Sequence, residues 1–387
     1  MKIAMTQLSL WPALGGGELY VYGLAKKLAY MGHDVWVFTT DLLGLPYMGR
    51  LKYEAPEEKN FHLIRNKGHV FDRYLGYDNR VFFQLMSQKF DIIHGHGFGY
   101  YHSEVASIIS KIKYTPFVFS PHGFFFGTKD DVNKFLSGVY LKVSQRTVLK
   151  QASKIIVDSR YEHKTYSSFT QPDKLVIIPQ DPTTVDFLTD GRVECSISRE
   201  LGIDNGFFFT MGRITESKGF QFIIKSIPEI NKILNNKQTV LIIGGEDHGY
   251  KEELKNLIKK FDIENQVYFI GKISEAKKKN AMSESKGVII PSKESYGIVA
   301  TEALARGALV IGAKGSGIEE RIIDGFNGYL IDTTSPTELA NAIISAEKVS
   351  PRIKSESSIY SKKMIREQYT LEATAKRIVN LYEELLD

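Results

Sequence analysis

The sequence has almost no cysteine and no long apolar run. Cys195 is the only cysteine among 387 residues, so an intramolecular disulfide is impossible and a reducing compartment is expected. No apolar stretch approaches the roughly 18–20 residues that a membrane-spanning helix needs. The apolar start, residues 1–17, is followed by a helical pattern and a second strand pattern at βαβ spacing. We therefore interpret it as a first strand and its turn rather than a signal peptide, and expect a cytoplasmic protein.

The net charge of the chain is also small. The net charge is +5, and the dense basic stripes typical of nucleic-acid-binding proteins are missing, so no nucleic-acid partner is expected. The excess is uneven: residues 1–180 hold 22 lysines and arginines against 15 acidic residues, whereas residues 181–387 hold 28 against 30. The basic first half favours an anionic partner, either a phosphate-bearing acceptor or the inner face of a membrane. A solvated surface without a partner is the alternative.

What the chain does have is enough apolar material for two cores. Hydrophobic residues make up 43% and charged residues 25%, and the length favours two domains. Short runs rich in Val, Ile and Phe, each followed by a helical pattern, lack polar alternation, which is typical of parallel strands buried on both faces. We predict an α/β fold of two Rossmann-like, doubly wound domains that face a central cleft. The runs are 2–8, 34–39, 91–94, 117–120, 154–158, 175–178, 207–211, 239–243, 267–270, 287–290, 308–311 and 328–331.

Turn-forming residues between about 180 and 206 interrupt this alternation. We place the domain boundary there, with an acceptor-binding domain at 1–185 and a nucleotide-sugar-binding domain at 186–370. The last helix, in 371–387, has helical apolar spacing and is expected to pack back on the first domain. Residues 50–80, with scattered aromatics and charges, are interpreted as irregular structure.

Two candidate sites follow strands of the first domain. Gly15, Gly16 and Gly17 open directly into a helix, and glycines at a helix N-terminus let main-chain amides hold a phosphate. Such turns also serve only to pack a helix on a strand. His122 follows another strand and precedes Gly123, at the sheet edge where ligands bind in open α/β folds. It is a candidate for contacting a substrate hydroxyl, with a purely local backbone contact as the alternative.

Two further histidines do not indicate a metal site. His94 and His96 are two residues apart on a strand or turn, and no third ligand lies nearby in the sequence. We expect neither a metal nor another cofactor.

In the second domain, cations follow the first strand. Gly212, Arg213 and Lys218 lie in the turn between the run 207–211 and a helix. Two fixed cations suit a pyrophosphate, whose negative charge rises as its bond to a sugar breaks. The alternative is an arginine that pairs with a carboxylate of the protein.

The most specific pattern is a pair of glutamates. Glu294 lies in the loop after the run 287–290, and Glu302 follows after seven intervening residues, about one turn into a helix. Carboxylates accept hydrogen bonds from vicinal hydroxyls, so one can hold a sugar and the other a ribose. Between them lie residues that shape the loop and the helix start: Tyr296, Gly297 and Ile298.

These residues resemble the retaining glycosyltransferases of family four, the glycosyl transferases group 1, which have the two-domain GT-B fold. The resemblance covers nearly the whole chain in the expected order. The cations after the run 207–211 match the family's pyrophosphate motif, the glycine loop matches its N-terminal loop, and His122 matches its acceptor-domain histidine. The C-terminal motifs that carry the resemblance are the two glutamates, 302–307 (EALARG), 315–317 (GSG), Glu319 and 324–330 (DGFNGYL).

The resemblance implies a role for each residue. Glu294 would contact the donor sugar, Arg213 and Lys218 would neutralise the departing diphosphate, and His122 would lie beside the anomeric centre. Glu302 would bind the ribose. Donor binding would also involve main-chain or side-chain contacts of Gly16, Gly17, Gly212, Tyr296, Gly297 and Ile298.

The family retains the anomeric configuration, usually without a metal, and the leaving phosphate can take the acceptor's proton. The chain departs from the family where an Asn-Gly pair usually follows the last strand of the first domain, because 178–182 reads IPQDP. No role is carried over to that loop. Gly315 and Gly317, separated by a serine, still allow close backbone approach.

The resemblance therefore implies a hexosyltransferase of glycan biosynthesis that uses a nucleotide-sugar donor and a glycan, lipid-linked or small-molecule acceptor. Two alternatives remain. One is another enzyme on this fold, such as a sugar-nucleotide epimerase or an inverting transferase. The other is a non-catalytic sugar-nucleotide binder. A membrane contact through the basic first domain would involve the aromatics in 124–126 and 74–77.

Overall fold

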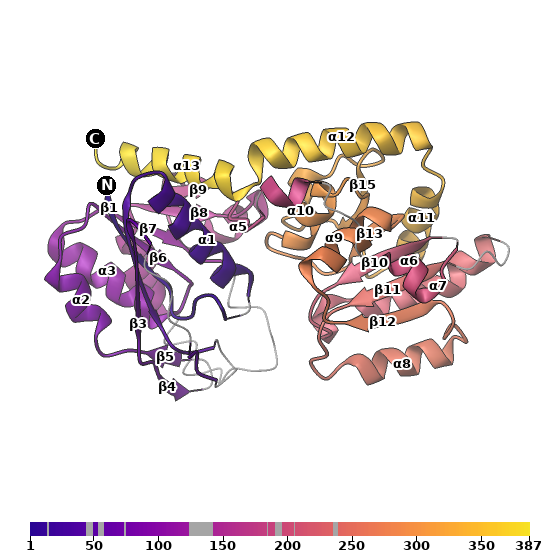
Figure 1. Cartoon of the computed structure of the whole chain (residues 1–387), viewed down its shortest axis with the longest axis horizontal. Coiled ribbons are helices and arrows are strands. Elements are labelled where there is room, and N and C mark those ends of the chain that lie inside the picture. The colour runs from indigo at the N-terminus through magenta and orange to yellow at the C-terminus, as the bar shows by residue number, and fades with distance from the viewer. Residues whose placement is uncertain are drawn as a thin grey trace. The chain divides into compact units, whose positions relative to one another are not determined.

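The computed structural model describes residues 1–13, 15–43, 49–52, 58–72, 75–123, 142–183, 185–189, 196–204, 206–234 and 239–387. Contacts divide the chain into two units, Met1–Pro182 with Tyr369–Asp387, and Thr183–Gln368. Each unit has its own parallel sheet (Figure 1). Cys195 and the aromatic run 124–126 lie outside the described residues.

The first unit contains a seven-stranded sheet in the order β3-β2-β1-β6-β7-β8-β9, with every pairing parallel. The order reverses between β1 and β6, and in open α/β sheets the carboxyl ends of the strands at such a reversal form the ligand site. The strands are β1 (Lys2–Thr6), β2 (Asp34–Thr40), β3 (Phe61–Asn66), β6 (Ile92–His96), β7 (Phe117–Ser120), β8 (Lys154–Val157) and β9 (Leu175–Ile177), with a hairpin of β4 (His69–Asp72) and β5 (Leu75–Tyr77).

Helices cover both faces of this sheet, which explains the continuous apolar runs of its strands. Ile3 and Met5 of β1 pack with α1 and α13, whereas Ala4 between them packs with α2 and α3 on the opposite face (Figure 1). The C-terminal helix α13 thus belongs to the core of the first unit. The helices are α1 (Gly16–Tyr30), α2 (Val81–Ser87), α3 (Tyr101–Lys113), the π-helical turn Gln145–Leu149, α5 (Arg160–Tyr166), the 3₁₀ turn Pro172–Lys174 and α13 (Leu371–Glu384).

The prediction of irregular structure for 50–80 is wrong, because β3, β4 and β5 lie there. β3 is the edge strand of the main sheet and pairs only with β2, so most of its residues are half-buried. An edge strand with one exposed side tolerates charges such as Arg65, and it lacks the continuous apolar run that marks a central strand.

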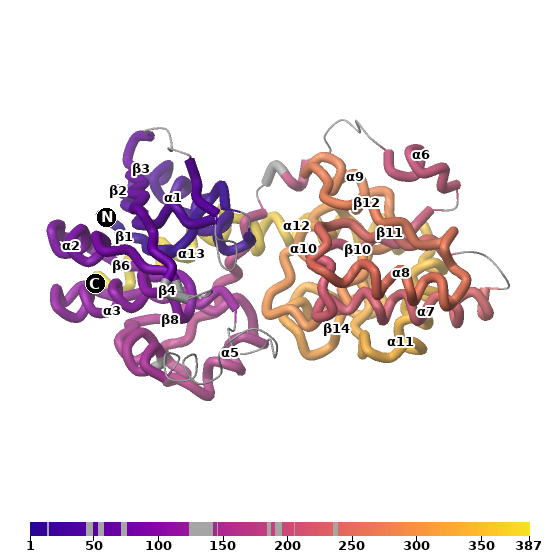
Figure 2. Tube along the Cα trace, turned by 90° about the horizontal axis from the view of Figure 1, so that it is seen from below, coloured from indigo at the N-terminus to yellow at the C-terminus, as the bar shows by residue number. Residues whose placement is uncertain are grey.

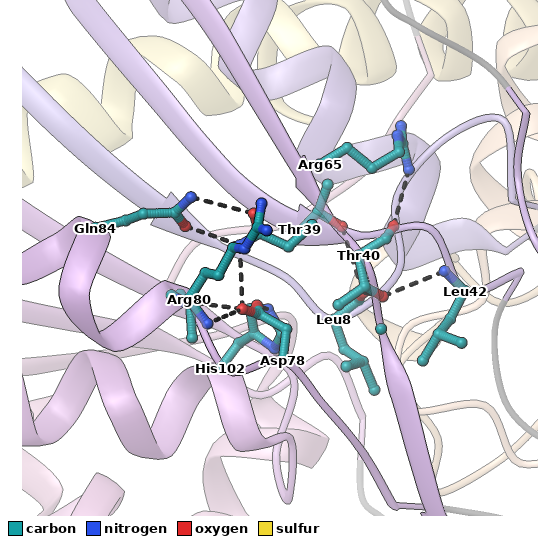
Figure 3. Close-up of polar contacts among 12 residues, drawn as sticks. Leu8, Thr39, Thr40, Leu42, Arg65, Asp78, Arg80, Gln84 and His102 are labelled. Atoms are coloured by element: carbon teal, nitrogen blue, oxygen red, sulfur yellow. Dashed lines mark hydrogen bonds and ion pairs between the residues drawn. The ribbon is translucent and has the colours of Figure 1, made fainter.

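Polar contacts hold the segment that follows β1 against the ends of β2 and β3 (Figure 3). The Thr40 hydroxyl donates to the Leu8 carbonyl at 2.6 Å and accepts from the Leu42 amide at 3.3 Å. The Arg65 guanidinium donates to the carbonyls of Thr40 at 3.1 Å and Trp11 at 2.9 Å. The chain therefore enters the glycine loop from an anchored position.

A second group in Figure 3 fixes the start of α2. One Asp78 oxygen accepts from the amides of Arg80 and Val81, and the other lies 2.9 Å from His102 on α3. Both side chains of the Asp78–His102 pair are fully buried. Because the carboxylate also accepts at the helix start, this pair ties α2 to α3.

The second unit contains a six-stranded parallel sheet in the order β12-β11-β10-β13-β14-β15. Its order reverses between β10 and β13. One core packs the sheet against α7, α8 and α11, while α10 contacts α9 and α12. Its strands are β10 (Phe207–Met211), β11 (Val240–Gly244), β12 (Val267–Gly271), β13 (Gly287–Ile290), β14 (Val310–Ala313) and β15 (Gly328–Ile331). Its helices and 3₁₀ turns are Val185–Leu188, α6 (Ile197–Leu201), Glu216–Lys218, α7 (Phe220–Ile233), α8 (Lys251–Lys260), α9 (Glu275–Glu284), α10 (Ile298–Ala305), Glu319–Arg321, α11 (Pro336–Glu347) and α12 (Pro351–Gln368).

The twelve predicted runs correspond to strands of the two main sheets, and the predicted α/β fold class is confirmed. In the described ranges, no helix combines the length and apolar character needed to cross a bilayer.

Candidate functional site

The glycine loop and His122 lie next to each other in the first unit. Gly16 and Gly17 begin α1 after β1, so their main-chain amides belong to the first turn, where helix amides have no partner within the helix. A Cβ atom placed on Gly17 would lie 3.8 Å from the Cβ and Cγ atoms of His122. The ring of Tyr20, one turn into α1, meets the His122 ring edge-on with centroids 5.5 Å apart. The two candidate sites of the first half thus form one site.

His122 belongs to a cluster of three histidines. Its Nε2 atom lies 2.9 Å from Nδ1 of His96, and the rings of His96 and His94 are tilted against each other with centroids 3.9 Å apart. His94 is hydrogen-bonded to Ser120 at 2.8 Å and to Tyr382 of α13 at 2.5 Å. Backbone φ at His122 is 56°, a left-handed value that is uncommon for a residue with a side chain.

Burial keeps these imidazoles neutral. It lowers the pKa of His122 to about 4, and it places the pKa of His94 and of His96 well below the usual value, with the neighbouring histidines adding to the effect. Among the described residues, no group of three or more His, Cys, Asp or Glu side chains is arranged to hold a metal ion. The cluster therefore offers neutral hydrogen-bonding groups.

Buried carboxylates support the loop that carries His122. Glu162, in the first turn of α5, accepts from the Gly123 amide at 3.0 Å and from the Asp158 amide at 2.6 Å. Burial raises the pKa of Glu162 to about 7, and burial together with the Glu162 charge raises that of Asp158. The amide of Gln180 donates to Asp158 at 2.8 Å. This network fixes the backbone next to His122.

In the second unit, one predicted cation and one predicted glutamate meet at the strand reversal. Lys218 ends the 3₁₀ turn after β10, and Glu294 lies in the loop after β13, the neighbouring strand. Their side chains form an ion pair of 2.6 Å and are each about one-quarter exposed. The Ser292 hydroxyl also donates to Glu294. Arg213 is exposed, and its guanidinium makes no ion pair with any residue in the described ranges.

Close backbone approaches shape the loops that follow β10 and β13. A Cβ on Gly245 would lie 1.9 Å from the carbonyl oxygen of Gly212, and a Cβ on Gly317 would lie 1.8 Å from the carbonyl oxygen of Ser295. Only glycine fits at such distances. The Gly317 amide donates to the Glu294 carbonyl at 2.7 Å, which holds the glutamate loop in place. The expected close approach near Gly315 and Gly317 is therefore present at Gly317.

The residues between the two glutamates form the start of α10. Gly297 is its N-cap with φ of 82°, and Ile298 is the first helical residue. The Tyr296 ring is buried under the Arg321 guanidinium at 4.1 Å, and the Arg321 side chain donates to the Thr301 hydroxyl. The buried Arg321 side chain thus fixes the residues at the start of α10.

Glu302, on the second turn of α10, forms a buried ion pair with Lys278 of α9. Lys278 Nζ lies 2.6 Å from Glu302 Oε1 and 2.8 Å from Glu275 Oε2. The side chains of Lys278 and Glu302 are only 10% and 11% exposed, and the Lys278 ammonium lies 5.4 Å from the centre of the Phe187 ring. The carboxylate of Glu302 is thus held by the ammonium of Lys278.

Sequence reasoning missed three residues of these sites: His96 as a partner of His122, Ser292, and Lys278. The two-residue spacing of His94 and His96 directs attention to metal binding and not to a contact with His122. Lys278 is 24 residues from Glu302, and a single lysine in a helix rich in lysine gives no signal of burial. The predicted residues fall into two groups, Gly16, Gly17 and His122 in the first unit, and Gly212, Arg213, Lys218, Glu294, Tyr296, Gly297, Ile298 and Glu302 in the second.

Comparison with known proteins identifies both halves of the chain. The family model described as glycosyl transferases group 1 matches residues 196–364, and the model described as Glycosyltransferase Family 4 matches residues 14–180. An uncharacterized glycosyltransferase of Methanocaldococcus jannaschii is 25% identical, covering 99% of this chain and 98% of the relative. The N-acetyl-alpha-D-glucosaminyl L-malate synthase of Bacillus anthracis is also 25% identical, covering 100% and 97%.

Solved structures share the fold. HepE of Anabaena, in complex with UDP, superposes with a TM-score of 0.77 at 18% identity, over 99% of this chain and all of that one. Sucrose-phosphate synthase of Thermosynechococcus elongatus gives a TM-score of 0.76 at 19% identity, over 100% and 99%. Both units thus match in the order that the sequence motifs indicated, and the chain belongs to glycosyltransferase family four with the GT-B fold.

Proposed function

We propose that this chain is a retaining glycosyltransferase that moves a sugar from a nucleotide-sugar donor to a hydroxyl group of an acceptor. The observation that carries the proposal is the charge arrangement at the strand reversal of the second sheet. There, the exposed cation Arg213 lies two residues after β10, and the Lys218–Glu294 pair joins the loops after β10 and β13. Cations at this point suit a diphosphate, and carboxylates suit sugar hydroxyls.

The Lys218–Glu294 pair favours a specific division of labour. A donor diphosphate would take the Lys218 ammonium as its counterion, which leaves the Glu294 carboxylate to accept from sugar hydroxyls. Arg213 adds a planar guanidinium that can donate two parallel hydrogen bonds to a phosphate. Both cations act most strongly where charge develops during bond breaking, so they contribute to turnover as well as to binding.

In the proposed reaction, the bond between the anomeric carbon and the diphosphate oxygen breaks, and a bond to the acceptor oxygen forms on the same face. The acceptor's proton passes to the departing phosphate oxygen, so no protein base is needed. The intermediate sugar carries positive charge. A neutral His122, placed beside the anomeric centre as the family resemblance implies, contacts this sugar without repelling it.

A thermal-shift panel tests the donor class. UDP-, GDP-, ADP- and TDP-linked sugars are each added with EDTA and again with Mg²⁺. A ligand at about 100 times its dissociation constant stabilises a fold by roughly 2.7 kcal/mol. We expect one base to raise the melting temperature in EDTA. Donor stabilisation only with Mg²⁺ contradicts the metal-independent part of the proposal, and no shift with any donor contradicts the transferase.

The anomeric configuration of the product tests retention. With the donor found in the panel, the product formed from an acceptor is followed by proton NMR, and we expect the donor's configuration to persist. An inverted product indicates the inverting alternative. Free sugar or an epimerised donor formed without acceptor indicates the epimerase, and donor binding without turnover against a broad acceptor set indicates a binding protein.

We further propose peripheral contact with an anionic membrane through the outer surface of α2 and α3, which lie side by side in Figures 1 and 2. Phe83 is 71% exposed and Tyr114, just after α3, is 94% exposed; Met86 and Ile112 are also exposed. The Lys113 ammonium donates to the Met86 carbonyl at 2.6 Å and joins the ends of the two helices.

The exposed lysines Lys89 and Lys111 border these apolar side chains, which is the combination that favours an anionic lipid surface. Of the aromatics expected from the sequence, 124–126 and Tyr74 lie outside the described residues, and Tyr77 is half-buried and stacked on His69. We expect flotation with anionic vesicles at low salt, weakened by Phe83→Ser but not by Tyr30→Ser, an exposed aromatic on α1. A protein that stays in the soluble fraction contradicts the contact.

A further inference from the structure

The buried partner of Glu302 calls for a functional explanation. A lysine inside a protein is costly because its charge loses hydration, and it is tolerated mainly when paired. Burial lowers the pKa of Lys278, but the carboxylates of Glu302 and Glu275 outweigh this and raise it overall, so the side chain is charged. Glu275 is 73% exposed and contributes a weak surface contact, whereas Glu302 is buried with the lysine.

The position of the pair links it to the donor side of the unit. Lys278 lies near the start of α9, which follows β12, and Glu302 lies on the second turn of α10, which follows β13. Helices that follow parallel strands begin at the carboxyl edge of the sheet, the edge where ligands bind. The Lys278 ammonium also lies over the Phe187 ring, 5.4 Å from its centre, which restricts the direction from which it approaches Glu302.

From this geometry we propose that Lys278 is a positioning residue for donor recognition: its ammonium holds Oε1 of Glu302 and so orients the carboxylate toward the vicinal hydroxyls of the donor ribose. The inference rests on the proposed function, in which Glu302 binds the ribose. Lys278 itself acts through Glu302 and selects ribose over deoxyribose. The reacting sugar and the diphosphate are recognised elsewhere, by Glu294, Arg213 and Lys218.

The test measures discrimination between riboses. Calorimetry gives the dissociation constants of UDP, 2′-deoxy-UDP and 3′-deoxy-UDP, or the same series on the base that the wild type prefers. For the wild type we expect the loss of a hydroxyl to weaken binding by about tenfold, as for a hydrogen bond to a charged group. The ratio of interest is the dissociation constant of a deoxy analogue divided by that of UDP. In Lys278→Met we expect this ratio to fall to near one, because the affinity for UDP drops while the affinity for the deoxy analogues hardly changes.

Two variants separate this role from a merely structural one. Lys277→Met is the matched control, because Lys277 neighbours Lys278 on α9 but pairs at 2.6 Å with Glu200, which is half-exposed; its ratio should equal that of the wild type. If circular dichroism shows Lys278→Met to be unfolded, Lys278→Gln is measured instead; its shorter, uncharged side chain lacks the ion pair with Glu302, so its ratio should fall below half of the wild-type value. A purely structural role lowers the melting temperature and leaves the ratio unchanged.

A folded Lys278 variant that keeps the wild-type ratio within about twofold overturns this inference and leaves the proposed function intact. A wild type that binds the diphosphate but does not discriminate between the riboses overturns the ribose role of Glu302, and the Lys278 inference with it. A wild type that binds none of the nucleoside diphosphates overturns the proposed function.

Discussion

The candidate residues of the two units have opposite electrical character. In the first unit, three histidines are packed together, and the surrounding protein lowers their pKa so that all are neutral near neutral pH. In the second unit, charges meet in pairs, Lys218 with Glu294 and Lys278 with Glu302. Histidine hydrogen bonds are short-range and uncharged, whereas ion pairs act over longer distances.

This difference matches what each unit has to recognise in the proposed reaction. A nucleoside diphosphate carries negative charge that increases as the sugar departs, so the second unit places cations where that charge develops. The sugar itself becomes positively charged, and a cation beside it would oppose the reaction. A neutral His122 avoids this repulsion and still provides hydrogen bonds.

Removing the exposed cation should have the largest effect. Arg213→Ala is expected to lower kcat by about 10²–10³-fold, the usual cost of losing one donor to a developing anion. Steady-state kinetics with saturating donor measure it. Lys225→Ala, an exposed lysine over the Phe222 ring on α7, is the matched control and should leave kcat unchanged. An increase in donor KM with an unchanged kcat would show that Arg213 contributes uniform binding instead.

Glu302→Ala should act on affinity. Loss of hydrogen bonds from ribose hydroxyls to a charged group is expected to raise the donor dissociation constant by about 10–100-fold. Calorimetry with the donor measures this change. Because alanine leaves Lys278 buried without its main partner, Glu302→Gln serves as the second variant, and Glu275→Ala, which removes only the exposed partner, is the control. Unchanged affinity in Glu302→Gln and Glu302→Ala would contradict the ribose role.

His122→Ala should lower turnover and spare donor affinity. We expect kcat to fall by about tenfold, since a neutral residue beside the reacting carbon contributes mainly to positioning. Single-turnover kinetics and donor calorimetry separate the two quantities. His62→Ala, on the edge strand β3, is the control. If His122→Ala and Glu302→Ala lose the same donor affinity, the proposed division of roles between the units is wrong.

The fold and most of the site residues were predictable because they depend on local patterns. Buried parallel strands leave apolar runs, and the residues after β10 and β13 converge because these strands are neighbours. The same rule fails for β3: an edge strand buries one side only, and its Arg65 and His62 interrupt the apolar run.

The partners of the predicted residues were not predictable, because they depend on distant contacts. Lys278 reaches Glu302 across 24 residues, and Tyr382 reaches His94 across 288. No periodicity or spacing in the sequence signals such pairs. Burial of a charged or titratable residue is likewise decided by tertiary packing, so the lowered pKa of His122 and the raised pKa of Glu162 follow only from the structure.

The smallest expected effect is on stability and tests the neutral character of the first unit. His122 has its pKa lowered from 6.5 to about 4, so on acidification through this window the unfolded chain binds more protons and the fold loses stability. Glu162 has its pKa raised from 4.5 to about 7, so the fold holds the extra proton and loses stability as the pH rises through that window. The two groups oppose each other between 4.5 and 6.5.

Single variants should therefore tilt the pH dependence in opposite directions. Between about pH 6.5 and about pH 5, the melting temperature of Glu162→Gln is expected to fall by a few degrees more than that of the wild type. The melting temperature of His122→Asn is expected to fall by a few degrees less. Scanning calorimetry at the two pH values measures the slopes. Replacing His122 also relaxes the lowered pKa of His94 and His96, and replacing Glu162 relaxes the raised pKa of Asp158, so these neighbours change each slope in the same direction. A His122→Asn slope equal to that of the wild type would mean that the folded chain binds a proton at His122 as readily as the unfolded chain, so that His122 is charged over most of this pH range. The first unit would then present a cation to the reacting sugar, and the electrical contrast between the two units would no longer hold.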